Sequence, residues 1–358
     1  MKMFRHVLIA GAVVGLVSVA AACGSSSTST VTVTSGGSSG GGSSNVLNGA
    51  GSTLVAPLMS QWIGAFAKLP AATTVTYGAV GSGGGVDAIT ARTVDFGASD
   101  APLSPAQATA CKGCLQIPWA LGATVVTYHA TGVPNNLRLT GQVVAEIFMG
   151  KITSWSDPAI AKLNPGVHLP STHISVIYRS DGSGDSYVFS SYLSAVDPAW
   201  KSSIGASTQP SFPTGSGDKG NSGVAAAVQA TNGAISYVGI SYIAADSLDQ
   251  ALIQNAAGKY PAPGVASIGA AAKAITTFNP DGSITLVNPP ASAAGAYPLS
   301  TYTYAIVPTK SPKAATLKAF LKYAISSTGQ AFGPPLGFPP LPAAVVAHDQ
   351  AEIAKIHS

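Results

Sequence analysis

The chain has 358 residues and a formal net charge of +4, with only 9% charged residues and 46% hydrophobic residues. This balance excludes a disordered chain, which combines low hydrophobicity with high charge. It is typical of a folded, loop-rich α/β protein. Lys2 and Arg5 account for two of the positive charges, and residues 1–22 contain no acid, so the remainder carries +2. The net charge therefore gives no reason to expect nucleic acid as a partner.

The N-terminal segment predicts export. Lys2 and Arg5 precede an uncharged run of small and apolar residues, and three alanines stand directly before Cys23. We expect residues 1–22 to be a signal peptide with a small-residue cleavage site. The alanines and the cysteine resemble a bacterial lipobox, although Ala20 stands where leucine is most usual. That resemblance implies that Cys23 carries a lipid and anchors the protein to a bilayer. The alternative is ordinary secretion without a role for Cys23.

A flexible tether is expected next. Residues 24–44 consist only of Gly, Ser, Thr and Val, which cannot bury a core. We therefore assign residues 23–45 to the lipidated cysteine and a linker. The rest of the chain is long enough for two domains.

The folded part alternates between strand and helix patterns, as in an α/β protein with mostly parallel sheets. In chain order, the hydrophobic spacing predicts a helix over 54–66, a strand over 73–77, a helix over 86–91, strands over 94–98, 124–129 and 174–178, helices over 187–195 and 224–229, a strand over 302–307 and a helix over 312–326.

Two further cysteines, Cys111 and Cys114, are separated by Lys and Gly. In an exported protein this spacing favours a small disulfide loop. A redox-active pair is the alternative. The sequence offers no suitably spaced thiols or histidines for a metal site.

Four glycine-rich turns precede predicted helices. Each places backbone N–H groups, with hydroxyl or acidic side chains beside them, at the positive end of a helix, and glycine allows an oxyanion to approach closely. A single turn of this kind is usually only a helix cap, but four in one chain, with Arg179 beside one of them, favour anion binding. The turns span residues 48–53, 81–85, 180–185 and 215–221.

At these turns the sequence resembles the periplasmic phosphate-binding proteins of ABC transporters. The matching stretches follow the family's order over roughly residues 46 to 330. They are Gly49-Ala50-Gly51-Ser52-Thr53, Gly81-Ser82-Gly83-Gly84-Gly85-Val86, residues 94–103, Gly150-Lys151-Ile152, Trp155, Leu163-Asn164-Pro165-Gly166, residues 179–184 and Lys219-Gly220-Asn221.

The resemblance implies the two-lobed fold of class II periplasmic binding proteins, in which two α/β lobes joined by hinge strands close on the ligand. One lobe is expected over residues 46–120 plus 297–358, and the other over 121–296. No cofactor is implied, because the ligand is inorganic phosphate itself.

The family's binding residues transfer one at a time. Phosphate is expected to receive hydrogen bonds from hydroxyls, backbone N–H groups and one guanidinium, whose planar fork suits an oxyanion. Leu54, where the family often has phenylalanine, would contribute only its main chain. The residues are Thr53, Leu54, Ser82, Arg179, Ser183 and Gly184.

Two acidic residues complete the expected set. Asp100 makes sense beside an anion only if the ligand carries a proton that its carboxylate accepts, as phosphate does and sulfate does not near neutral pH. Asp185 stands where threonine is common in the family. Its carboxylate either caps a helix, turned aside, or is a second proton acceptor. The second alternative predicts weaker binding as the pH rises.

The expected function is therefore capture of phosphate outside the membrane and its delivery to the permease and ATPase subunits of an ABC transporter. A receptor for another tetrahedral oxyanion, and a phosphate-sensing surface lipoprotein or adhesin, are the alternatives. An enzyme is not expected, because the part of the sequence expected to fold has no Gly-x-Ser-x-Gly elbow and no dense His/Asp cluster.

Overall fold

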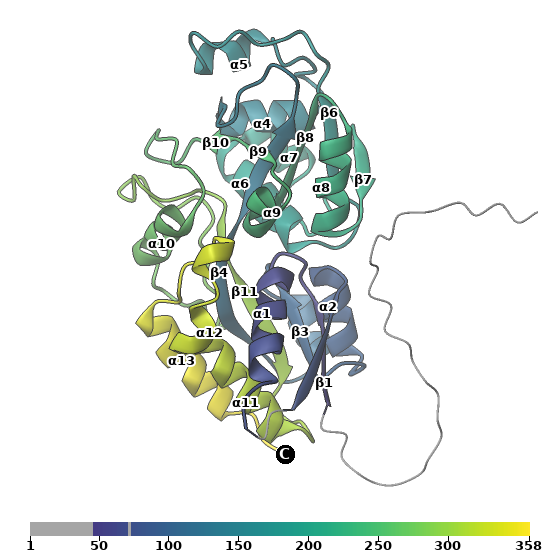
Figure 1. The fold of residues 1–358 in the computed structure, drawn as a ribbon, viewed down its shortest axis with the longest axis vertical. Helices are drawn as coiled ribbons and strands as arrows, with labels where there is room; N and C mark the ends of the chain where they lie inside the picture. The colour runs from purple at the N-terminus through teal and green to yellow at the C-terminus, as the bar shows by residue number, and fades with distance from the viewer. Residues whose placement is uncertain (1–45, 71–72) are drawn as a thin grey trace, which may run out of the picture. The chain divides into compact units, whose positions relative to one another are not determined.

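One long strand ties the fold together. Strand β4 (Cys114–His129) has sixteen residues and is buried along most of its length. Up to Ala123 it pairs with β11 (Ser300–Pro308), and from Thr124 onward it pairs with β8 (Ala234–Gly239). Because β4 passes from one set of neighbours to the other, the strands form two groups that share it (Figure 1).

These observations come from a computed structural model, which describes residues 46–70 and 73–358. The predicted signal peptide (1–22), the lipidation of Cys23 and the linker (23–45) lie outside the described residues. Within the described ranges, no helix is both long and apolar enough to cross a membrane.

We call the two groups lobe 1 and lobe 2. Lobe 1 has the strand order β2-β1-β3-β11, followed by the first part of β4, and lobe 2 continues from the second part of β4 through β8, β6 and β7. The elements before β4 and from β11 onward are β1 (Val46–Gly51), α1 (Ala56–Phe66), β2 (Thr74–Ala79), α2 (Ser82–Thr90), β3 (Phe96–Ser99), α3 (Pro105–Cys111), β11, α11 (Ala314–Ile325), α12 (Ser327–Gln330), the 3-10 helix η1 (Pro334–Leu336) and α13 (Ala343–Ala354).

Between β4 and β11 the chain forms the remaining strands and helices. The short strand β9 also pairs with β4, and β5 pairs with β10 in a separate two-stranded sheet. These elements are β5 (Arg138–Leu139), α4 (Gly141–Phe148), α5 (Pro158–Leu163), β6 (Ser175–Arg179), α6 (Gly184–Val196), α7 (Pro198–Ser203), β7 (Ser216–Asp218), α8 (Gly220–Ala230), β8, α9 (Ile240–Ala245), β9 (Asp249–Gln250), β10 (Leu252–Ile253) and α10 (Val265–Ala274).

The pairing is mixed, whereas the sequence predicted mostly parallel sheets. Parallel pairing is confirmed away from the shared strands, where β1 lies parallel to β2 and β3, and β6 lies parallel to β7 and β8. At the centre the prediction is wrong, because β11 runs antiparallel to β3 and β4, and β4 runs antiparallel to β8. The chain leaves lobe 1 along β4 and returns to it along β11, so the two crossing strands run in opposite directions.

Aromatic side chains fill both halves of the core. Trp62, Trp119, Trp155 and Trp200 are all fully buried, which confirms that they are packing residues. In lobe 1, the rings of Trp62 and Trp119 lie 5.4 Å apart. Burial of rings this large is a strong contribution to the hydrophobic stability of each lobe.

Candidate functional site

The four glycine-rich turns meet where the lobes face one another. From lobe 1, the Oγ of Ser82 accepts a hydrogen bond from the N–H of Gly184 at 3.1 Å, and the N–H of Gly83 donates to the carbonyl of Gly182 at 2.8 Å. The Oγ1 of Thr53 accepts a hydrogen bond from Asn221 at the start of α8. Direct contacts thus join the turns before α1 and α2 to the turns before α6 and α8.

Glycine is required for this close approach. Gly81 has a φ of +90°, and a Cβ at this position would lie 2.2 Å from the Oδ2 of Asp181. A Cβ on Gly184 would lie 2.5 Å from the Cβ of Asp100 and 2.8 Å from the Oγ of Ser82. Side chains at these two positions would hold the lobes apart, so the glycine pattern reflects the contact between the turns.

Asp100 lies at the centre of the lobe 1 side, directly after β3, and is 1% exposed. The hydroxyl of Ser52 donates to both carboxylate oxygens at 2.6 and 2.7 Å, and the hydroxyl of Thr303 donates to Oδ1 at 2.7 Å. Ser82 adds a bond of 3.2 Å to Oδ2. Burial, followed by the negative charge of Asp185, raises the pKa of Asp100 to about 7, although the three hydroxyl donors act to lower it.

Arg179 ends β6 in lobe 2, and its side chain is fully buried. Its Nε and Nη2 donate to the two carboxylate oxygens of Asp181 at 2.7 and 2.6 Å, and its Nη1 donates to Asp185 at 3.0 Å. Burial would raise the pKa of Asp181, but the hydrogen bonds and charge of Arg179 outweigh it, so this pKa lies below its ordinary value. A guanidinium has five N–H donors, and its bonds to these two described carboxylates use three of them.

Asp185 is fully buried in the first turn of α6. Its Oδ1 accepts from the hydroxyl of Thr124 at 2.8 Å, and its Oδ2 accepts from Asn221 at 2.8 Å as well as from Arg179. The side chain that caps α6 is Ser183, whose Oγ accepts from the N–H of Ser186. Asp185 is therefore not the capping residue. Burial raises its pKa, against the opposing effects of Arg179, Thr124 and Asn221.

Thr53 and Leu54 lie in the turn between β1 and α1. Tyr242 of α9 donates to the carbonyl of Thr53 at 3.0 Å. The side chain of Leu54 is fully buried, and it packs so closely against Gly239 at the end of β8 that a Cβ there would lie 3.0 Å from its Cγ. Leu54 is thus a packing residue between the lobes, and a ligand contact through its main chain stays a prediction.

We call the polar side chains around Asp100, Arg179 and Asp185 the cluster. The cluster carries more negative than positive charge. When ionised, Asp100, Asp181 and Asp185 supply three negative charges against the single positive charge of Arg179. Arg179 forms ion pairs with both Asp181 and Asp185, so its one charge is shared between two carboxylates, and the buried Asp100 adds a third. A ligand at this position gains stability if it is an oxyanion that brings its own protons, since each proton can be donated to a carboxylate.

Four polar residues of the cluster were not predicted from the sequence to be site residues. Ser52 and Asn221 lie inside the glycine-rich turns, but other residues of those turns attracted the prediction. Thr124 and Thr303 are on β4 and β11, where each is one of two threonines in the strand and the sequence gives no signal of its partner. Only the crossing of these strands brings their hydroxyls to Asp185 and Asp100.

The two cysteines of the described chain lie at the end of α3 and at the start of β4. A disulfide bond joins Cys111 and Cys114. The guanidinium of Arg92 donates to the carbonyl of Cys111 at 2.7 Å and to the Sγ of Cys114 at 3.3 Å. Arg92 thereby fastens this loop to the end of α2, which is a structural arrangement.

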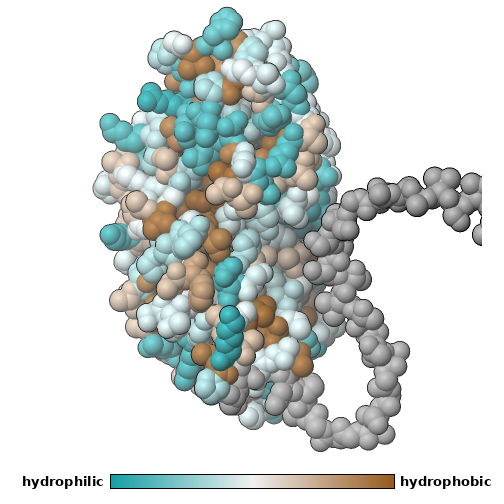
Figure 2. All heavy atoms as spheres, in the orientation of Figure 1, coloured by the Kyte–Doolittle hydropathy of each residue, from teal (hydrophilic) through white to brown (hydrophobic). Residues whose placement is uncertain are grey.

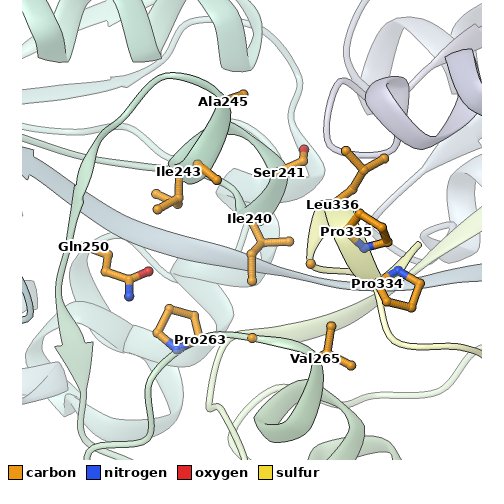
Figure 3. A pocket seen from close by; sticks show the side chains of 13 residues that line it. Ile240, Ser241, Ile243, Ala245, Gln250, Pro263, Val265, Pro334, Pro335 and Leu336 are labelled. Carbon is orange, nitrogen blue, oxygen red and sulfur yellow. The ribbon is translucent and has the colours of Figure 1, made fainter. Parts of the chain in front are cut away.

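A separate cavity of about 560 Å³ lies between α9, the segment before α10, and η1 (Figure 3). Figure 2 shows apolar side chains gathered in the middle of this face, near α9. None of the predicted phosphate-binding residues lines the cavity, whose apolar lining includes Ile240, Ile243, Pro263, Val265, Pro334 and Leu336.

Two α/β lobes that share crossing strands and meet at glycine-rich helix starts define the class of periplasmic binding proteins. The PBP superfamily domain matches residues 26–328. The phosphate-binding protein PstS of Xylella fastidiosa (strain Temecula1) is 39% identical over 312 residues, which cover 85% of this chain and 84% of that protein. This chain therefore belongs to the PBP superfamily and, within it, to the PstS family of phosphate-binding proteins.

Solved structures share the fold. A phosphate-binding protein from Stenotrophomonas maltophilia superposes with a TM-score of 0.69 and 23% identity, covering 86% of this chain and 93% of that one. A high-affinity periplasmic phosphate-binding protein, solved with phosphate bound, gives a TM-score of 0.69 with 21% identity, covering 85% and 93%. These likenesses establish the two-lobed architecture.

Proposed function

We propose that this protein binds inorganic phosphate between its two lobes, outside the membrane, and delivers it to the permease of a phosphate ABC transporter. The proposal rests on one observation. Asp100 is buried in a site whose other groups can donate hydrogen bonds to an anion. A buried carboxylate in the same group of side chains as a buried guanidinium suits a ligand that is both an anion and a proton donor. Phosphate has both properties near neutral pH, and the PstS proteins to which this chain is similar are named for binding it.

The residues divide into donors and acceptors. In the proposed complex, Arg179 and the hydroxyls of Ser82 and Thr53 donate to phosphate oxygens, and the N–H groups of Leu54, before α1, and of Ser183 and Gly184, at the start of α6, add main-chain donors at positive helix ends. Three of these donors must exchange a present bond for one to phosphate, because the Ser82 hydroxyl donates to Asp100, the Gly184 N–H to Ser82, and the Ser183 N–H to the carbonyl of Thr208. Asp100 accepts a proton of the ligand. Asp185 is a second carboxylate, paired with Arg179. In this assignment each ligand oxygen exchanges its hydration for hydrogen bonds from both lobes.

The unusual charge balance explains selectivity. Sulfate carries no proton near neutral pH, so it cannot donate a hydrogen bond to the buried Asp100, and the two negative charges would repel one another. A missing buried hydrogen bond alone costs about 1–3 kcal/mol. Arsenate is protonated like phosphate, and this mechanism does not separate the two.

The lobes close around the ligand by a hinge motion, with β4 and β11 as the hinge strands. We assign residues 46–120 plus 297–358 to the first lobe and 121–296 to the second. Phosphate passes from the closed form to the permease, while the ATPase subunits of the transporter drive import. The protein itself binds and releases its ligand without chemical conversion.

Export and anchoring are part of the proposal. The basic and apolar residues 1–22 direct the chain across the membrane, and a lipid on Cys23 holds it at the outer face of the cell membrane. Residues 23–45 then form the tether between the lipid and the folded lobes. Mass spectrometry of the membrane-associated protein tests this point, since it identifies the first residue and its lipid.

The main test is calorimetric titration of the protein, purified in detergent and stripped of co-purified ligand, with phosphate, arsenate and sulfate at several pH values. Tight phosphate binding without sulfate heat is the expected result. Equal binding of phosphate and sulfate would point to a general oxyanion receptor. Binding of none of the ions would overturn the proposal in favour of a surface adhesin.

Transport is tested separately from binding. Deletion of the gene should abolish high-affinity phosphate uptake by the cells, and the wild-type gene should restore it. If phosphate binds tightly in vitro but uptake survives the deletion without change, the protein is a phosphate sensor rather than the receptor of the transporter.

A further inference from the structure

Asn221 connects the two lobes at the centre of the cluster. It lies near the start of α8, directly after Gly220, whose φ is +71°, and it is fully buried. Its backbone N–H donates to the Oγ1 of Thr53 at 3.3 Å, and its side-chain Nδ2 donates to the same oxygen at 2.9 Å. The same Nδ2 donates to the Oδ2 of Asp185 at 2.8 Å.

The orientation of this amide is fixed by the end of β8. The N–H of Gly239 donates to the Oδ1 of Asn221 at 2.9 Å. If the amide were rotated by half a turn, its NH₂ group would face that N–H and its oxygen would face the carboxylate of Asp185. Both contacts would be repulsive, so the NH₂ group must point to Thr53 and Asp185.

The bonds to Thr53 determine what its hydroxyl can do. A threonine hydroxyl has two acceptor lone pairs and one O–H hydrogen. Asn221 supplies donors for both lone pairs, so the hydroxyl is left to act as a hydrogen-bond donor. A ligand at Thr53 is therefore required to offer an acceptor, as an oxyanion does.

The bond to Asp185 acts on the other side of the site. The Oδ2 of Asp185 receives hydrogen bonds from Asn221 and from Arg179, which turns this oxygen toward the protein. Without Asn221, the oxygen would keep one unsatisfied lone pair in a buried site. Its negative charge would then be less well balanced where an anionic ligand binds.

We propose that Asn221 is a positioning residue that couples lobe closure to ligand affinity, by setting Thr53 as a donor and holding Asp185 away from the ligand. The inference rests on the proposed function, because phosphate is the ligand used to test it. Thr53 belongs to lobe 1, whereas Asn221 and Asp185 belong to lobe 2, so this arrangement is complete only when the lobes are in contact.

A double-mutant cycle tests the coupling. Asn221→Ala and Thr53→Val are each expected to weaken phosphate binding about ten- to a hundredfold, as for the loss of a buried hydrogen bond. Because Asn221 acts partly through Thr53, the double variant should lose less affinity than the product of the two single losses, by roughly fivefold or more. Independent effects that multiply fully would overturn the proposed coupling.

A third variant separates positioning from folding. Asn221→Asp keeps the size of the side chain but places a carboxylate against Asp185, so its phosphate affinity should fall more steeply with rising pH than that of the wild type. Asn232→Ala is the matched control, since Asn232 is exposed and contacts the backbone of Thr131. Thermal unfolding of each ligand-free variant identifies any that fail to fold.

The outcomes distinguish failure of the proposed function from failure of the role of Asn221. If wild-type protein does not bind phosphate, the proposed function fails. If the wild type binds phosphate, the folded Asn221→Ala variant binds as tightly, and Asn221→Asp has the wild-type pH profile, the proposed function stands and the role of Asn221 is refuted.

Discussion

The hydroxyl of Ser52 lies within hydrogen-bond distance of both carboxylate oxygens of Asp100, at 2.6 and 2.7 Å, with both residues buried. One donor thus supports the ionised form of a carboxyl group whose pKa burial raises to about 7. Since an ionised Asp100 is needed to accept a proton from phosphate, Ser52 supports binding without being placed in contact with the ligand.

Replacement of Ser52 should therefore weaken binding in a pH-dependent way. In Ser52→Ala, the lost hydrogen bond raises the pKa of Asp100 further, so more of the protein holds a neutral Asp100 near pH 7. We expect phosphate affinity to fall about tenfold there, with a smaller loss above pH 8, where Asp100 is ionised in either protein. Calorimetry at both pH values checks this, with the exposed Ser60→Ala as control. A loss that is equal at the two pH values would contradict the mechanism.

Replacement of Asp100 should change selectivity. In Asp100→Asn, the neutral amide is a weaker acceptor for the phosphate proton than a carboxylate, and its NH₂ group can donate to an unprotonated oxygen. The preference for phosphate over sulfate should therefore fall by at least about tenfold, through weaker phosphate binding and measurable sulfate binding. Asp87→Asn on the exposed face of α2 is the matched control. Competition titrations with the two ions measure the ratio, and an unchanged ratio would assign selectivity to other residues.

A second buried carboxyl group, Asp349 on α13, should govern part of the pH dependence of stability. Its Oδ1 lies 3.3 Å from the Nδ1 of His348, its Oδ2 has no hydrogen-bond partner among the described residues, and the other charged or titratable groups facing it are Glu352 and Tyr302. Burial raises its pKa from 3.8 to about 7.

The folded protein holds this proton more tightly than the unfolded chain does. The contribution to stability is therefore complete below about pH 4 and is lost as the pH rises to 7, by on the order of a few kcal/mol. In Asp349→Asn, the free energy of unfolding should depend less on pH over this range and should exceed the wild-type value at pH 8. Denaturant titrations of the ligand-free proteins measure both. Equal slopes for wild type and variant would show that Asp349 does not titrate in this range.

The sequence predicted the outer parts of the fold better than its centre. Helices such as α1 and α11 have clear apolar spacing, and their positions are confirmed. The first half of β4 was missed because Pro118 and Gly122 interrupt an apolar run. Pro118 is tolerated in the sheet because the register with β11 shifts beside it, between Thr303 and Tyr304.

The site residues also divide into those that local sequence patterns predict and those that they do not. Local chemistry predicted the turns that hold Ser82 and Arg179, since glycine next to hydroxyl or charged residues before a helix has a direct meaning in sequence. It gave no information on Thr124 and Thr303, which reach the site only because β4 and β11 cross between the lobes. Partners that are set by tertiary crossing, rather than by spacing along the chain, are not encoded in any local pattern.

Asp185 offers the sharpest test of how charge controls affinity. Near neutral pH, phosphate loses a proton as the pH rises, and the dianion then meets the charges of both Asp100 and Asp185. Among the described residues, Arg179 is the cation that pairs with Asp185. Affinity should therefore fall with rising pH. Asp185→Asn removes one negative charge from the site, so its affinity should fall less steeply between pH 6 and pH 8.

Comparison with wild type at two pH values, and with a control variant, makes the effect of Asp185→Asn on the pH dependence of affinity specific. The amide of the variant keeps the size of Asp185 and still accepts from Thr124 or Asn221, whereas the ion pair with Arg179 is lost, so the variant should bind more weakly than wild type at pH 6 and approach it at pH 8. Asp87→Asn again serves as control. Dissociation constants measured by calorimetry at half-unit steps of pH give the two slopes. Parallel slopes would mean that Asp185 only anchors Arg179 and that Asp100 alone senses the protonation of phosphate.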